Sequence, residues 1–184
     1  MDKFFIKIDM SLRVAVFLRR SNLLFLLILL LLSPAALAMS HLSEQAINNQ
    51  LVGKTAPDLV LSKTDGASAS IMAARQGQKA VLIFWATWCP HCYEELGAIN
   101  NQVADIEKKG IKVILVDMGE TKEDVQEYFL KRQMKLISFV DTDSALQEPY
   151  HLVGIPTLVF VDEKGVVCNV THVFPADYET FFRK

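Results

Sequence analysis

An apolar run that ends close to a pair of cysteines constrains this chain more than any other feature of its sequence. Residues Ala80–Trp85 are continuously apolar, which predicts a strand buried on both faces of a sheet. The segment Trp88–Cys92 follows almost at once and reads WCPHC. Apolar positions then recur at spacings of three and four as far as Ile106, as on one face of a helix. A buried strand is therefore expected to turn directly into a helix, with both cysteines at the turn.

The remaining segments alternate between strand and helix patterns. In the first half we expect a hairpin of Pro57–Leu61 and Ala69–Met72, and then the Ala80–Trp85 strand with its helix, which Gly110 ends. A strand over Ile111–Val116, a helix from Thr121 to Arg132 and a short strand over Leu136–Val140 should follow. The last part should form a broken helix over Asp141–Leu152, a hairpin of Thr157–Val161 and Val166–Val170, and a terminal helix opened by Pro175. This order predicts an α/β fold: a central mixed β-sheet flanked by helices, with an N-terminal β-hairpin extension.

Residues 1–38 have the order of regions found in secretory signal peptides. A net basic stretch is followed by the apolar run Leu23–Leu32 and by the small-residue sequence Ala36-Leu37-Ala38. This order favours a signal peptide cut after Ala38, with an uncleaved N-terminal membrane anchor as the alternative. Pro34 interrupts the apolar run short of the ~20 residues that a spanning helix needs, which favours cleavage.

Either version of the leader gives the same organisation for the rest of the chain. Residues 39–52 are a polar lead-in, and residues 53–184 form one domain outside the cytoplasm, in the periplasm or at the extracytoplasmic face of the membrane. The formal net charge of the chain is -2, whereas proteins that bind nucleic acid are basic. We therefore expect no nucleic-acid partner.

The spacing of the cysteines indicates chemistry rather than stability. The chain has three cysteines, and a bridge between Cys89 and Cys92 closes too short a loop to be a useful structural staple. At the N-terminus of a helix, unpaired N–H groups and the helix dipole stabilise an anion, so the pKa of Cys89 should fall below its usual ~8.5. Cys92, one turn later, can then attack a mixed disulfide formed by Cys89. The pair predicts thiol–disulfide exchange.

The two residues between the cysteines are consistent with this chemistry. Pro90 suits the first position of a helix, where its missing N–H is not needed. A protonated His91 would add positive charge beside the thiolate. Because stabilising the thiolate stabilises the reduced form, such a charge makes the disulfide a stronger oxidant.

A metal site is the main alternative for the cysteine pair. Structural zinc takes four ligands, and no second CxxC or HxxxH pattern supplies the others. His151, His172 and Cys168 are available but scattered, and His172 carries no interpretable signal. Cys168 lies in an apolar strand pattern and is expected to be a buried, inert thiol, with a regulatory or intermolecular disulfide as its alternative. We expect no cofactor and no resident metal; a periplasmic copper- or zinc-handling module using Cys89 and Cys92 as ligands is the alternative function.

Four segments of the chain match a known pattern: Val52–Asp58, Phe84–Cys89, Glu94–Leu96 and Gly154–Thr157. Together they resemble the thioredoxin superfamily, and specifically its exported TlpA/ResA-type thiol–disulfide oxidoreductases. The resemblance runs from about Val52 to Val170. It implies a thioredoxin-like fold and an enzyme that exchanges disulfides with protein thiols or disulfides in the cell envelope. A membrane or periplasmic protein would be its redox partner.

The resemblance also implies roles for individual residues. Pro156 would be a cis-proline that faces the disulfide, and the backbone of Ile155 would pair with an extended partner peptide. Trp88 would flank the nucleophile as a partly exposed contact surface, whereas Trp85 is expected in the core.

The chain departs from the thioredoxin pattern in two places. Thioredoxin has a buried aspartate where this chain has Ile83, and the TlpA/ResA-type pattern instead has a glutamate at the position of Glu95. We expect Glu95 to assist proton movement at Cys92 or to tune partner contact, with an exposed helix glutamate as the alternative. Many relatives carry CxPC, whereas CPHC resembles the strongly oxidising DsbA-type enzymes. The direction of exchange, reductase or oxidase/isomerase, is therefore open.

Overall fold

The computed structural model describes residues 50–182, so the predictions for the leader and for nearly all of the 39–52 lead-in lie outside the described residues. Its elements are β1 (Val60–Lys63), β2 (Ser68–Ser70), α2 (Ile71–Ala74), β3 (Lys79–Trp85), α3 (Pro90–Lys108), β4 (Ile111–Met118), α4 (Lys122–Arg132), β5 (Ser138–Asp141), β6 (Thr157–Val161), β7 (Val167–Thr171) and the 3-10 helix η1 (Tyr178–Phe182). The strands form one seven-stranded sheet in the order β2-β1-β5-β4-β3-β6-β7.

The predicted apolar strand lies inside this sheet. β3 runs parallel to β4 and antiparallel to β6, and its last residue, Trp85, lies opposite Asp117 of β4. A sheet that combines both strand directions confirms the expected mixed α/β fold. The expected N-terminal hairpin is also present, because β1 and β2 pair antiparallel, and β1 continues the sheet by pairing with β5.

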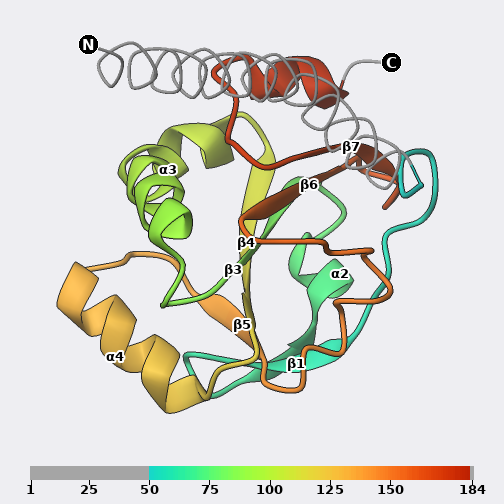
Figure 1. Ribbon diagram of the computed structural model, residues 1–184. Coiled ribbons are helices and arrows are strands. Elements are labelled where there is room, and N and C mark those ends of the chain that lie inside the picture. Colours follow the sequence, from blue (N-terminus) through green and yellow to red (C-terminus); the bar gives the residue numbers. More distant parts are fainter. Residues whose placement is uncertain (1–49, 183–184) are drawn as a thin grey trace, which may run out of the picture. The chain divides into compact units, whose positions relative to one another are not determined.

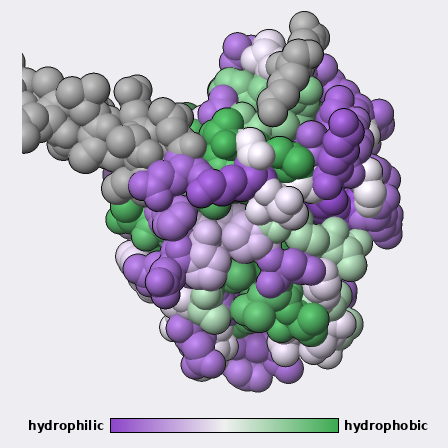
Figure 2. Space-filling view, turned by 90° about the vertical axis from the view of Figure 1, so that its right-hand side faces the viewer, coloured by the Kyte–Doolittle hydropathy of each residue, from purple (hydrophilic) through white to green (hydrophobic). Residues whose placement is uncertain are grey.

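The sheet separates two apolar layers. Figure 1 shows α3 and α4 on one side of the strands and α2 on the other. Alternate residues of β3 serve the two layers: Val81, Ile83 and Trp85 pack with α3 and α4, whereas Leu82 and Phe84 pack on the α2 side. β3 is buried on both faces for this reason. On the face drawn in Figure 2, hydrophobic side chains form small groups separated by hydrophilic ones.

Capping residues set the ends of the two long helices. Thr121 caps α4 by accepting the Asp124 N–H at 3.2 Å, as the sequence predicts, and Val125 and Phe129 of that helix are buried. After α3, Gly110 takes a positive φ of 74°, a conformation that glycine adopts without strain. Both helix boundaries agree with the sequence predictions.

The broken helix expected over Asp141–Leu152 is wrong, because this segment forms successive turns. The Asp141 carboxylate accepts the N–H groups of Ala145 and Leu146 at 2.9 and 2.8 Å, so a side chain takes the place of helical carbonyls. Ser144 and His151 have positive φ values of 53° and 49°, which a continuous right-handed helix does not allow.

Two other boundaries also differ from the predictions. Ile71 and Met72, expected at the end of the second hairpin strand, belong to α2 because Ser70 caps that helix by accepting the Ala73 N–H. At the C-terminal end, Pro175 is followed by a turn and then by η1 rather than by an α-helix that begins at the proline.

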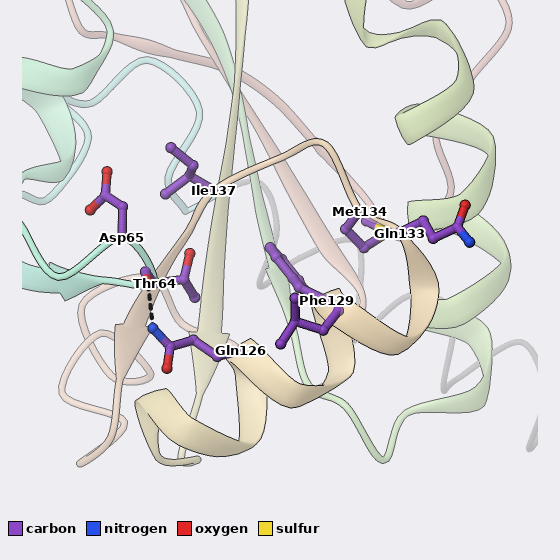
Figure 3. Close-up of a pocket in the computed structure, with 8 residues that line it drawn as sticks. Thr64, Asp65, Gln126, Phe129, Gln133, Met134 and Ile137 are labelled. Carbon is purple, nitrogen blue, oxygen red and sulfur yellow. Dashed lines mark hydrogen bonds between the residues drawn. The ribbon is translucent and has the colours of Figure 1, made fainter.

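A cavity of about 710 Å³ lies between α4 and the turn that follows β1 (Figure 3). Phe129 and Ile137 line it, and the Gln126 amide donates a hydrogen bond to the Thr64 carbonyl at 2.6 Å across its edge. None of its lining residues belongs to the cysteine motif. Within residues 50–182, no helix has both the length and the apolar character to span a bilayer.

Candidate active site

The cysteine motif forms the junction between β3 and α3. The Ala86 carbonyl accepts the Cys89 N–H at 3.3 Å and closes a turn directly after the strand. Cys89 then caps α3, with its Sγ accepting the Cys92 N–H at 3.1 Å, and Pro90 is the first helical residue. The sulfur of Cys89 therefore lies where the helix dipole and the Cys92 N–H both favour negative charge.

The two cysteines are joined in a disulfide. Both cysteines are largely buried, with exposed fractions of 5% for Cys89 and 1% for Cys92. Cys89 is therefore the more accessible of the two. Trp88 is 68% exposed beside them, whereas Trp85 is fully buried, and both tryptophans therefore lie as the sequence predicts.

The loop before β6 faces the disulfide. The Ile155–Pro156 peptide bond is cis, as expected, and the Ile155 carbonyl oxygen lies 3.7 Å from Cys89 Sγ. A cavity of about 200 Å³ lies beside this loop and is lined by Trp88, Met118, Ser144, Gln147, Leu152, Val153, Gly154 and Ile155. Two sequence segments that were expected to share a site, around Cys89 and around Pro156, are therefore adjacent.

The other predicted site residues lie on α3. His91 is exposed in the first turn of the helix. Glu95 is half-buried, and its Oε2 accepts the backbone N–H of Phe174 at 2.9 Å. Glu95 thus links α3 to the segment that follows β7, and its part in proton movement at Cys92 stays a prediction.

His172 is a site residue that the sequence analysis missed. Its Nδ1 lies 2.9 Å from the Pro156 carbonyl oxygen and 3.3 Å from the hydroxyl of Thr157. That hydroxyl also donates to the Gly154 carbonyl at 2.6 Å. His172 and Thr157 together fasten the loop that faces the disulfide.

A second missed group lies at the other side of the cysteine turn. Glu120, in the loop between β4 and α4, accepts hydrogen bonds from the backbone N–H and the hydroxyl of Thr87. Asp117, near the end of β4, is fully buried, and burial followed by the nearby Glu120 raises the pKa of Asp117 to about 9. The sequence did contain one hint of this group: Asp117 interrupts an otherwise apolar strand pattern. That strand ends at the edge of the sheet where the cysteines lie.

The remaining candidate ligands do not gather around the disulfide. Among residues 50–182, no three histidine, cysteine, aspartate or glutamate side chains group as a metal site. Cys168 is half-buried rather than buried, lies on β7, and has its Sγ 3.6 Å from the Val166 carbonyl oxygen. Among the described residues, no third histidine, cysteine or carboxylate ligand therefore joins Cys89 and Cys92 as a metal site.

A disulfide-bonded CxxC pair at this position of this fold defines the class: the protein is a thiol–disulfide oxidoreductase of the thioredoxin superfamily. More particularly, the chain belongs to the AhpC/TSA family, whose family model matches residues 52–170.

Relatives of this class are similar to the chain over most of its described part. The thiol-disulfide oxidoreductase ResA of Geobacillus thermodenitrificans is 29% identical over 119 residues, which cover 65% of this chain and 68% of the relative. ResA of Bacillus subtilis is 28% identical over 118 residues, covering 64% and 65% of the two chains. Among solved structures, a putative thiol:disulfide interchange protein DsbE from Chlorobium tepidum has a TM-score of 0.62 and 27% identity, covering 70% of this chain and 91% of that one.

Proposed function

We propose that this oxidoreductase exchanges disulfides with exported proteins, with Cys89 as the nucleophile and Cys92 as the resolving thiol. One observation carries the assignment of roles: Cys89 Sγ occupies the cap of α3, 3.1 Å from the Cys92 N–H, while Cys92 lies one turn inside the helix. The cap stabilises a thiolate, which is the attacking form of sulfur. The greater exposure of Cys89 also supports its role as the first contact of a partner.

The exchange needs no group besides the sulfurs of the two proteins. In the reducing direction, the Cys89 thiolate attacks a partner disulfide, a mixed disulfide forms, and one partner sulfur leaves as a thiolate. Cys92 gives its proton to the thiolate released in the first step or to water, and its own thiolate then attacks Cys89 Sγ and releases the second partner sulfur. The chain is left with the Cys89–Cys92 disulfide, and two electrons have passed to the partner. The oxidising direction is the reverse sequence.

The surroundings of the disulfide suit an extended segment of a partner protein. The Ile155 backbone lies beside Cys89 Sγ, and the exposed Trp88 borders the adjacent cavity of about 200 Å³. A partner segment next to Ile155 could place its cysteine over Cys89 and an apolar neighbour in this cavity. Such an arrangement gives the backbone and Trp88 the contact roles expected of them.

We place this activity in the cell envelope, either in the periplasm or at the extracytoplasmic face of the membrane. The signal-like leader supports this location, as does the similarity to ResA and DsbE proteins. The CPHC sequence favours oxidation or isomerisation, whereas many TlpA/ResA-type relatives reduce their partners.

Trapping of mixed disulfides tests the proposed function. Cys92→Ser should accumulate covalent adducts between Cys89 and envelope proteins, because the second step is blocked. Cys89→Ser is the matched control and should form none. If both variants give the same adducts, or if neither forms any, the assignment of Cys89 as the exchanging thiol is wrong.

A further inference from the structure

Glu120 holds the turn that leads into Cys89 through two hydrogen bonds to a single residue. The Thr87 N–H donates to Glu120 Oε2 at 2.6 Å, and the Thr87 hydroxyl donates to Glu120 Oε1 at 2.5 Å. Thr87 is the second residue of the turn that the Cys89 N–H closes on the Ala86 carbonyl. Both oxygens of one carboxylate therefore fix the residue two positions before the candidate nucleophile.

The loop that carries Glu120 is itself tied to the sheet. Its neighbour Gly119 donates its N–H to the carbonyl of Asp141, the last residue of β5, at 2.9 Å. Gly119 has a positive φ of 84°, and a Cβ added there would meet the Ser144 hydroxyl at 3.1 Å. A side chain at this position would therefore be both strained and crowded. Glu120 therefore contacts Thr87 from a loop whose backbone is held in place.

Asp117 lies near Glu120 and, among residues 50–182, no basic group is found to lower its pKa. It is fully buried, and neither of its carboxylate oxygens makes a hydrogen bond with the described residues. The charged form of such a group is disfavoured, and the carboxylates of Glu120 and Asp124 disfavour it further. Burial and these carboxylates raise the pKa of Asp117 to about 9. The two donors of Thr87 bind the carboxylate of Glu120.

We propose that Glu120 is a positioning residue for the exchange reaction: by fastening Thr87 it keeps Cys89 at the cap of α3. This inference rests on the proposed function. Its physical content is the 3.1 Å contact between Cys89 Sγ and the Cys92 N–H. A loose turn lengthens that contact on average, and a smaller fraction of Cys89 is then thiolate.

A double-mutant cycle tests the inference on the reduced full chain. Thr87→Val keeps the side-chain shape and removes the hydroxyl, and Glu120→Ala removes both acceptors. Each should lower the rate constant for reaction with a small-molecule disulfide at pH 7 by about three- to tenfold, roughly what the loss of one ordinary hydrogen bond costs. Because Glu120→Ala already removes the hydroxyl bond that Thr87→Val removes, the double variant should react no more slowly than Glu120→Ala alone.

Two further variants separate positioning from charge and from folding. Glu120→Gln can still accept the Thr87 N–H through its amide oxygen and donate to the hydroxyl, so it should recover most of the lost rate. Glu123→Gln makes the same chemical change at an exposed site in the first turn of α4 and should react like the unmodified chain. If Glu120→Ala does not fold, Thr87→Val and Glu120→Gln test the inference by themselves. A slow reaction in Thr87→Val together with a near-normal rate in Glu120→Gln supports it, and any other combination contradicts it.

The outcomes distinguish this inference from the proposed function. Wild-type rates for Thr87→Val and Glu120→Ala, or effects that simply add in the double variant, would overturn the positioning role while the exchange activity stands. A wild-type protein without Cys89-dependent exchange would overturn the proposed function and this inference together.

Discussion

His172 Nδ1 lies 2.9 Å from the carbonyl oxygen of Pro156, so a side chain of β7's C-terminal extension holds the loop that faces Cys89. The contact ties the proposed partner-binding backbone to the end of the sheet. Its hydrogen atom belongs to His172 in this pair, because a carbonyl oxygen can only accept.

We predict that His172→Ala slows exchange with a protein disulfide about fivefold, the equivalent of ~1 kcal/mol for one hydrogen bond. The rate with a small-molecule disulfide should change less, since a small molecule depends less on the Ile155 backbone. Stopped-flow rates with both kinds of disulfide check this. His151→Asn is the control: His151 is exposed and has a positive φ that asparagine tolerates. Equal slowing with both disulfides would contradict a role in partner binding.

Glu95 offers a test between proton transfer and structure. Glu95→Gln keeps an oxygen that can accept the Phe174 N–H, as the native Oε2 does at 2.9 Å, but it cannot take up a proton. If Glu95 moves a proton at Cys92, this variant should resolve mixed disulfides about a hundredfold or more slowly, the range of general acid–base effects. Its unfolding free energy should stay close to that of the unmodified chain. Unchanged resolution in Glu95→Gln would leave Glu95 with the structural contact alone.

The buried Asp117 should make the stability of the fold depend on pH. Burial and Glu120 raise its pKa to about 9, above the value of 3.8 that is usual for an exposed aspartate. Between these values the unfolded chain releases a proton that the folded chain keeps, so the free energy of unfolding falls as pH rises, by up to about 1.4 kcal/mol per pH unit. The stabilising effect is complete below pH 4 and is lost as the pH rises through about 9.

Asp117→Asn removes this ionisation while keeping the shape of the side chain. Its free energy of unfolding is measured with denaturant on the oxidised protein. As the pH is raised from 5 to 8, this free energy should rise relative to that of the unmodified chain. Glu120 and Asp124 are the charged groups that act on Asp117, and Tyr128 of α4 lies within the field of Glu120. Parallel stability curves for the two proteins would show that Asp117 is not the group responsible.

His91 should tune the reduction potential of the disulfide. Positive charge beside the Cys89 thiolate stabilises the reduced form, so His91→Ala should make the potential more negative, by about 10–30 mV where about 30 mV corresponds to ~1.4 kcal/mol. Equilibration with glutathione buffers measures the value, and His151→Asn again serves as control. The unmodified value also addresses direction: about -120 mV would favour an oxidase and about -270 mV a reductase. An unchanged reduction potential in His91→Ala would show that His91 does not tune the disulfide.

Features set by local sequence could be predicted, and features set by register could not. The β3 strand, the cysteine cap of α3 and the Thr121 cap of α4 each depend on residues close together in the chain. The bond from Glu120 to Thr87 joins residues 33 positions apart, and it exists only because β3 and β4 pair with Trp85 opposite Asp117. No local pattern encodes such a pairing.

The same distinction explains the remaining differences. The Asp141–Leu152 segment looks helical because its apolar spacing is helical, yet the Asp141 carboxylate binds the N–H groups that a helix would have used. The cis bond at Pro156 was expected from the family pattern rather than from composition. His172 carried no signal in the sequence because its partner is the backbone carbonyl of Pro156, just before β6 and 16 positions away.

The parallel pairing of β3 with β4 brings the ends of both strands to one edge of the sheet. The loop after β4 therefore supports the cysteine turn without containing any sulfur. On the positioning role proposed for Glu120, a change in this loop would alter how readily the disulfide is reduced while the CPHC sequence stays the same. Substitutions in this loop offer a way to adjust the oxidising strength of such an enzyme while its four-residue motif is left untouched.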